Sequence, residues 1–309
     1  MNLPQKIIRN VQSVLLGKPE AVRLAVACLM AEGHLLVEDI PGVGKTTLAL
    51  ALSRSIDGSF QRIQFTSDLM PSDLLGVSVY DVPSQSFQFK PGPVFHNVVL
   101  ADEINRASPK TQSALLESMQ ERQVSIDSRT HPLPKPFFVI ATQNPHEHHG
   151  TFPLPESQLD RFMMRLSLGY PSVETETAIL RGDATSPRVA ALAPVAGADE
   201  VGAEIERIRG IAVDESLDRY MVDIARATRE SALVDLGLSP RGTLALRRAS
   251  QALAAVEDRS YVIPDDIKAA GVAVLAHRLR LKTSNFNGHS SRAADDVVRE
   301  ILGQVAVPA

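Results

Sequence analysis

The chain has 309 residues, which is enough for a large core and suggests two domains or one large domain with an appendage. Hydrophobic residues make up 44% and charged residues 22%, as in ordinary globular proteins. The formal net charge of −4 gives no bulk electrostatic reason to expect nucleic acid or an anionic membrane as a partner. The single cysteine, Cys28, excludes an internal disulfide, and its apolar neighbours predict a buried side chain.

The start of the sequence lacks the pattern of a secretory leader. No stretch approaches the roughly 18 to 20 uninterrupted apolar residues of a transmembrane helix. We therefore expect a cytoplasmic protein, which would reach a membrane only through its partners.

Strand and helix patterns alternate through the first half of the chain. Apolar runs that end in polar residues predict strands of a parallel sheet, at His34 to Glu38, Asn97 to Glu103, Phe137 to Asn144 and Phe162 to Leu168, with Phe60 to Thr66 as a fifth candidate. Helical patterns lie between them, at Ala21 to Met30, Thr46 to Ser55 and Pro109 to Gln120. This alternation predicts a doubly wound α/β domain over residues 1–172, with ligands beyond the carboxyl ends of the strands.

Two hairpin patterns interrupt this domain, near residues 76–89 and 123–137, where a minimal doubly wound domain would have short loops. From Val173 onward no strand-like run recurs, alanine becomes frequent and amphipathic helices follow. Residues 173–309 are therefore predicted to form a small, all-helical domain with a C-terminal tail.

Residues 36–49 read LVEDIPGVGKTTLA, a strand, a glycine-containing loop and a helix. The pattern G-x-x-x-x-G-K-[ST] of a phosphate loop fails at its first position, where Asp39 replaces glycine. That position is a strand exit, remote from the phosphate, so Asp39 is acceptable if its φ angle is negative. Gly42 and Gly44 would let backbone N–H groups approach phosphate oxygens at the helix N-terminus.

The end of this loop supplies the charged and polar groups. Lys45 provides a point charge for the β and γ phosphates, and Thr46 a hydroxyl ligand for Mg²⁺. The residues expected to bind the nucleotide in this segment are Pro41, Gly42, Val43, Gly44, Lys45, Thr46 and Thr47.

An apolar strand ends at Asp102 and Glu103. After a phosphate loop, such a pair predicts that Asp102 orients Mg²⁺ and that Glu103 polarises the attacking water, although strands also often stop at acidic turns. Ser108 and Pro109 then start a helix. The strand FFVIATQN ends at Asn144, whose amide could hold the lytic water or read the γ-phosphate, although Asn-Pro after a strand is by itself usually a turn.

Together, these segments resemble the MoxR family of AAA+ ATPases. The resemblance rests on EDIPGVGKTTLA, ADEINRASPKTQSALLESMQERQV, ATQNP, FPLPESQLDRF and LSPRGTLALRRASQA, and extends from about residue 4 to residue 282. It implies an αβα core with a five-stranded parallel sheet, a helical lid and the two hairpin inserts. It also implies a ring, usually hexameric, with ATP at the subunit interfaces.

The resemblance also implies roles for two arginines. Arg161 in LDRF would be the arginine finger that reaches the γ-phosphate of a neighbouring subunit, and Arg241 in LSPRG the sensor-2 arginine of the lid. Independently, Ser239 and Pro240 predict a helix start, which favours an anion near Arg241. The reserve candidates for these roles are Arg165 and Arg106.

One segment departs from the family pattern. Residues 146–150 read HEHHG, and His146, His148 and His149 could bind a transition metal, but such loops are usually solvated. Further on, the basic run 277–282 (HRLRLK) favours a solvated or lid-packing role over a nucleic-acid patch.

The resemblance implies a chaperone-like ATPase that requires ATP and Mg²⁺, remodels or activates partner proteins and works with von Willebrand factor A domain proteins. The remodelling would aid metal-cofactor insertion or the assembly of complexes. One alternative function is a chelatase-type motor subunit, which would share every site residue. The other alternative is a DNA-translocating motor. It is disfavoured because the hairpins offer few cations, which are Lys90, Arg129 and Lys135.

Overall fold

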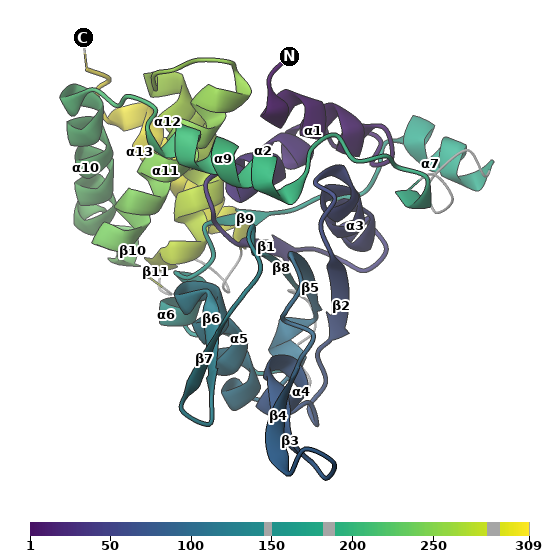
Figure 1. The fold of residues 1–309 in the computed structure, drawn as a ribbon. Coiled ribbons are helices and arrows are strands. Elements are labelled where there is room, and N and C mark those ends of the chain that lie inside the picture. Colours follow the sequence, from purple (N-terminus) through teal and green to yellow (C-terminus); the bar gives the residue numbers. More distant parts are fainter. Residues whose placement is uncertain (145–149, 182–188, 283–290, 309) are drawn as a thin grey trace.

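The computed structural model describes residues 1–144, 150–181, 189–282 and 291–308 (Figure 1). A parallel sheet with the strand order β2-β5-β8-β1-β9 lies at its centre. All five predicted strands are confirmed, each within its predicted range. They are β1 (Leu35–Glu38), β2 (Phe60–Gln64), β5 (Val98–Asp102), β8 (Phe138–Gln143) and β9 (Met164–Leu166).

The inner strands β1, β5 and β8 are buried on both faces, and their alternate residues enter different cores. Leu35 and Leu100 face a core shared with the N-terminal helices and the lid, whereas Leu36 and Val99 face a second core that includes α5. The core helices are α1 (Leu3–Gln12), α2 (Pro19–Met30), α3 (Lys45–Ser55), α4 (Pro71–Leu75), α5 (Pro109–Glu121) and α6 (Glu156–Leu159), with the 3-10 turn η1 (Ile104–Arg106).

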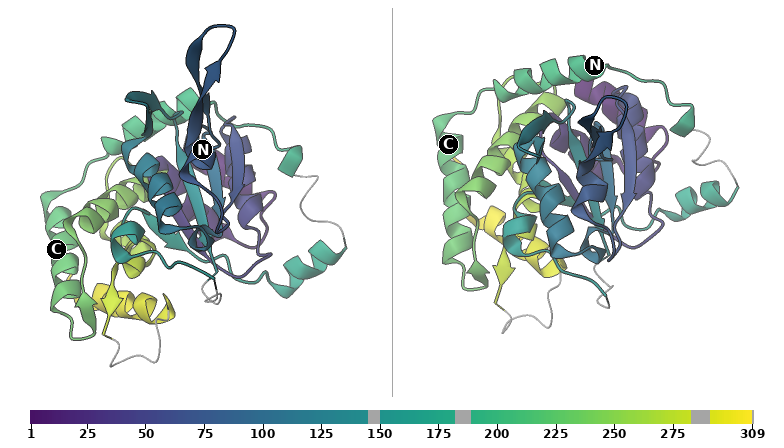
Figure 2. Two further views of the ribbon diagram at one scale, coloured as in Figure 1. Left: turned by 90° about the horizontal axis from the view of Figure 1, so that it is seen from below. Right: turned by 60° about the horizontal axis from the view of Figure 1, so that its bottom comes forward.

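Both predicted hairpins are present, and they project from the same side of the molecule (Figure 2). The first pairs β3 (Gly76–Asp81) with β4 (Ser86–Pro91), and the second pairs β6 (Gln123–Ile126) with β7 (Arg129–Pro132). Stacking of the Phe89 and His131 rings, with centroids 4.0 Å apart, joins the two hairpins.

The C-terminal part is helical, as predicted, with one small addition. Strand β10 (Val234–Leu236) pairs antiparallel with β11 (Arg280–Leu281), a two-stranded ribbon that the sequence patterns did not reveal. The lid helix α11 also packs against α2, so the N-terminal helices contact both parts of the chain. The helices after β9 are α7 (Val173–Leu180), α9 (Ala198–Arg209), α10 (Glu215–Glu230), α11 (Pro240–Val256), α12 (Pro264–Leu275) and α13 (Ser291–Gln304), with the 3-10 turn η2 (Ala276–Arg278).

Across the described ranges, no helix is both long enough and apolar enough to cross a membrane.

The base of the first hairpin depends on a close backbone approach at Gly92. A Cβ atom there would lie 2.3 Å from the carbonyl oxygen of Leu74 and 2.5 Å from the amide nitrogen of Gly76. We expect Gly92→Ala to lower the free energy of unfolding by about 1–3 kcal/mol, because backbone atoms must move apart. In α9, Gly202→Ala meets nothing within 4 Å and should stabilise by up to about 1 kcal/mol. Urea unfolding compares the two, and equal stabilities would contradict the packing argument.

Candidate functional site

The phosphate loop joins β1 to α3 and has the backbone conformation that its glycines allow. Gly42 and Gly44 have φ angles of +84° and +104°, which glycine adopts without strain. A Cβ atom on Gly42 would meet nothing within 4 Å, so the loop is open at that point. Gly44 is the N-cap of α3, whose first N–H groups are therefore left for an anion.

Asp39, the departure from the strict motif, has a structural role. Its side chain is buried, and Oδ2 accepts hydrogen bonds from the backbone N–H groups of Leu168 (2.5 Å) and Gly169 (2.7 Å) and from the Ser167 hydroxyl (3.1 Å). Oδ1 accepts one from Ile40 N–H at 3.0 Å. The φ angle of Asp39 is not positive, which confirms the condition for its acceptance. Asp39 therefore ties the end of β1 to the segment after β9.

Asp102 and Glu103 are organised by one hydroxyl group. The fully buried Thr142 donates from Oγ1 to Asp102 Oδ1 at 2.6 Å and accepts from Glu103 N–H at 2.9 Å. Glu103 has a φ angle of +57°, in the left-handed region that non-glycine residues rarely adopt. A strained backbone of this kind persists where the surroundings determine it, and it often marks a functional position.

Side chains from β2 and η1 hold the same two carboxylates. Gln64 Nε2 donates to Glu103 Oε2 at 2.6 Å, and Arg106 Nε lies 3.1 Å from the same oxygen. Arg62 pairs with Asp102 Oδ2 at 2.5 Å. Arg106, a reserve candidate for the arginine finger, is therefore engaged inside its own subunit.

These groups surround one cleft of about 340 Å³. Lys45 reaches back to the carbonyl oxygen of Asp39, with Nζ 2.8 Å away. The cleft contains a lysine, a threonine hydroxyl and two carboxylates at the N-terminus of a helix, which suits a phosphate group with a divalent cation. Its lining residues are Pro41, Gly42, Gly44, Lys45, Thr46, Thr47, Arg62, Gln64, Asp102, Glu103 and Asn144.

Arg161 and Arg241 line a second cleft, of about 400 Å³, between the core and the lid. Arg248, two helical turns beyond Arg241 on α11, lines it as well. For these three side chains no ion pair or hydrogen bond occurs with any described residue. Arg241 lines the cleft that contains Arg161 and does not line the cleft that contains Lys45, and its sensor-2 role stays a prediction.

Arg165, the other reserve candidate, is enclosed. Its guanidinium pairs with Glu38 at 3.1 Å and with Asp295 of α13, and its side chain is only 9% exposed. Burial is the main cause that raises the pKa of the Asp295 carboxyl. Glu38 also accepts a hydrogen bond from Gln143, next to Asn144. Arg165 therefore links the strand ends to the lid.

The two other sequence candidates have different outcomes. The histidines of the HEHHG segment, His146, His148 and His149, lie outside the described residues. In the basic run, His277 and Arg278 are buried against the core, which agrees with the lid-packing interpretation. Burial lowers the pKa of His277 well below its usual range.

Sequence reasoning missed the residues that hold the site together. Thr142 lies in an apolar strand. A hydroxyl group buried there must have a hydrogen-bond partner, and this was the one signal in the sequence for its role. Gln64 and Arg62 belong to β2, whose neighbour is β5, and this pairing follows only from the sheet order.

The sequence profile of the ATPase family associated with various cellular activities (AAA) matches residues 34–164, and that of the AAA lid domain matches residues 226–301. A solved structure of a proposed ATPase from Cytophaga hutchinsonii superposes with a TM-score of 0.88 at 37% identity, covering 100% of this chain and 96% of that one. The fold, the first cleft and these matches define an AAA+ ATPase domain with its lid.

Similar proteins narrow this class. The chain is 46% identical to the uncharacterized protein YeaC of Bacillus subtilis, over 98% of this chain and 94% of that protein. It is 40% identical to chaperone MoxR1 of Mycobacterium tuberculosis (98% and 82%), and 30% identical to protein MoxR of Methylorubrum extorquens (97% and 94%). The chain belongs to the MoxR family of AAA+ ATPases.

Placing the glycine of the strict phosphate-loop pattern at position 39 should lower the stability of this protein. Asp39→Gly removes a buried carboxylate and leaves N–H groups of the segment after β9 without a partner, at a cost of about 1–3 kcal/mol for each unsatisfied group. We expect a lower midpoint of urea unfolding. An unchanged midpoint would show that the carboxylate contributes nothing to the position of the loop.

Thr142→Val keeps the shape of the side chain but removes the hydroxyl between Asp102 and Glu103. We expect loss of about 1–3 kcal/mol of stability, because the Glu103 N–H loses its partner, and a lower rate of phosphate release from ATP. Thr142→Ser, which retains the hydroxyl, is the control and should stay near the wild-type rate. Equal rates for Val and Ser would contradict this role.

Proposed function

We propose that the protein hydrolyses ATP in a ring of identical subunits, with six as the expected number, and uses this reaction to remodel or activate partner proteins. The observation that carries the proposal is the division of the site. The phosphate loop and the acidic pair meet in one cleft, whereas Arg161 and Arg241 face another without a partner among the described residues.

The residues of the first cleft suit hydrolysis. Lys45 offers its charge to the β and γ phosphates of the substrate, and the loop N–H groups bind phosphate oxygens. Thr46 and Asp102 would hold Mg²⁺, for which oxygen ligands are suitable, and the bound ion would neutralise charge on the phosphates. Glu103 orients a water molecule for in-line attack and accepts its proton, and Asn144 helps to position that water.

The second cleft suits stabilisation of charge on a neighbour. In a head-to-tail ring the second cleft of one subunit meets the first cleft of the next. Arg161 then neutralises charge that develops on the γ-phosphate of the neighbour, and Arg241 contributes from the same side. This arrangement explains why both arginines lie away from the Lys45 of their own chain.

The hairpins favour a protein partner over nucleic acid. The first hairpin exposes Tyr80, Val82 and Phe87, at 50%, 73% and 68%, and the charged residues within it are Asp81 and Lys90. Binding to a phosphate backbone needs several cations on one surface. We therefore favour proteins as clients. The expected partners are von Willebrand factor A domain proteins, and the expected location is the cytoplasm. A chelatase-type motor subunit would use the same site on a different partner.

Mixing two inactive variants tests the ring. Lys45→Ala removes phosphate binding but keeps the arginines, and Arg161→Ala does the reverse. We expect each to lose most ATPase activity alone, by about 10³-fold or more for the arginine. Mixtures should regain a fraction of wild-type turnover, because an intact loop meets an intact arginine at some interfaces.

The control for this experiment is Glu103→Gln mixed with Lys45→Ala. Both substitutions disable the first cleft, so no interface combines the intact parts and activity should stay lost. No recovery of the Arg161→Ala mixture at any ratio would contradict the proposed ring.

A further inference from the structure

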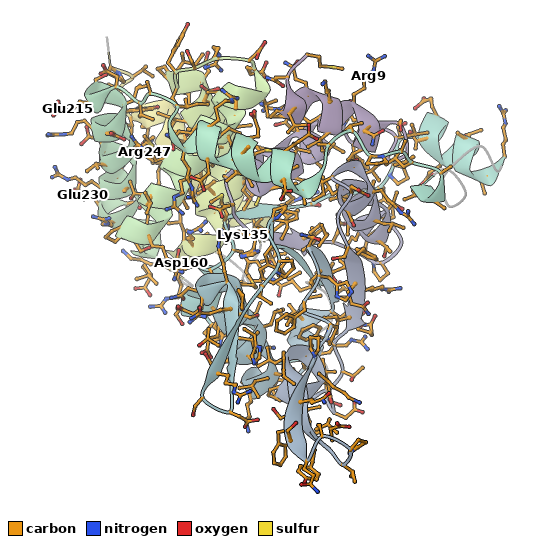
Figure 3. The ribbon with its side chains drawn as sticks, in the orientation of Figure 1. Arg9, Lys135, Asp160, Glu215, Glu230 and Arg247 are labelled. Atoms are coloured by element: carbon orange, nitrogen blue, oxygen red, sulfur yellow. The ribbon has the colours of Figure 1, made fainter. Side chains whose placement is uncertain are left out.

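Asp160 lies where the lid meets the core, directly before Arg161 in the chain (Figure 3). Its carboxylate accepts two hydrogen bonds from the lid. Oδ1 accepts from Arg278 Nε at 2.7 Å, and Oδ2 accepts from the Ser239 hydroxyl at 3.2 Å. The two donors come from different lid elements, η2 and the start of α11.

Arg278 anchors the backbone around Arg161. Its side chain is 3% exposed, and its Nη atoms donate to the carbonyl oxygens of Phe162 (2.7 Å), Met163 (3.0 Å) and Asp160 (3.3 Å). The Nε2 atom of His277 lies 3.0 Å from the same Phe162 oxygen. The turn that carries Arg161 is therefore bound to the lid through both its backbone and the Asp160 carboxylate.

Ser239 connects the same carboxylate to Arg241. It is the N-cap of α11, with its hydroxyl oxygen accepting from Gly242 N–H at 3.1 Å, and Arg241 follows two residues later in the first turn. The Asp160 carboxylate thus links the turn that contains Arg161 to the start of the helix that carries Arg241.

We propose that Asp160 is a positioning residue that fixes Arg161 and Arg241 relative to each other, so that the core turn and the lid present both arginines to the neighbouring subunit as one rigid unit. This inference rests on the proposed ring. Asp160 itself does not touch the substrate. We infer that the pair of Asp160 with Arg278 selects one geometry for its partners. A buried ion pair adds little net stability relative to apolar residues of similar size, whereas removal of one partner alone is destabilising.

A second ion pair of the lid provides a matched control. Arg247 Nε lies 2.8 Å from Asp218 Oδ1, and both residues belong to lid helices. Its distance and chemistry match the pair of Asp160 with Arg278, but its side chains are more exposed, at 35% and 43% against 3% and 19%. Neither Arg247 nor Asp218 lines the two clefts.

The experiment compares Asp160→Asn with Asp218→Asn in the full chain. Asp160→Asn should lower the maximal ATPase rate by roughly 10- to 100-fold, because a misplacement of about 1 Å costs up to about 10²-fold. The KM for ATP and the binding of a fluorescent ATP analogue should change much less than the rate, since the lining of the first cleft is intact. Asp218→Asn should keep the wild-type rate.

Mixing identifies which site is damaged. Lys45→Ala subunits should restore turnover to Asp160→Asn subunits, whereas Arg161→Ala subunits should not, because Asp160→Asn and Arg161→Ala disable the same side of the interface. Recovery with Arg161→Ala instead, or a wild-type rate for Asp160→Asn alone, would overturn the inference and leave the proposed ring in place. Failure of Arg161→Ala itself to recover with Lys45→Ala would overturn both.

A second variant protects the test against misfolding. Ser239→Gly removes the hydroxyl that donates to Asp160, and glycine at an N-cap costs only a few tenths of a kcal/mol relative to serine. Thermal unfolding establishes that each variant is folded. Ser239→Gly should show the same mixing pattern with a smaller loss of rate, and a full wild-type rate in this variant would count against Asp160 as the link to Arg241.

Discussion

The buried carboxylate of Asp39 fixes the end of strand β1, and the geometry of the phosphate loop depends on it. Three donors in the segment after β9 form hydrogen bonds with this carboxylate. The loop therefore begins at a residue whose side chain is fixed to that segment. A glycine at this position supplies freedom of φ and no side-chain bond. Here the chain exits in an ordinary conformation and gains a bond to the segment that leads towards the lid. Lys18 strengthens that junction, because its ammonium donates to the carbonyl oxygens of Gly169 and Tyr170.

The strands, the hairpins and the helix starts could be predicted from the sequence because their signals are local. Apolar runs with polar ends marked the strands, and Ser108 and Ser239 marked helix starts by their capping chemistry. The ribbon of β10 and β11 could not be predicted, since its strands are two and three residues long and pair across more than forty residues. Strands of this length carry too few residues for an alternating pattern.

The residues of the candidate site were named from the sequence, but their partners in the structure follow from tertiary structure. Asp102, Glu103 and Asn144 end neighbouring parallel strands, so their proximity follows from the sheet order. Thr142 serves both carboxylates only because β8 lies beside β5 in the observed register. The role of Asp160 depends on lid contacts more than seventy residues away in sequence, a separation that no motif records.

The second cleft has an electrostatic consequence for assembly. Arg161, Arg241 and Arg248 line it together with the buried Arg278, and Asp160 is the carboxylate that pairs with this last arginine. Like charges near one another cost free energy, and solvent screens that cost only while the cleft is open. Closing the cleft against a neutral surface would increase the repulsion between the arginines. Closing it against a polyanion would instead make the electrostatic free energy of closure favourable. In the proposed ring, bound nucleotide supplies that anion. Contact between subunits would therefore be stronger when the first cleft is loaded, which couples the state of one site to the interface that completes it.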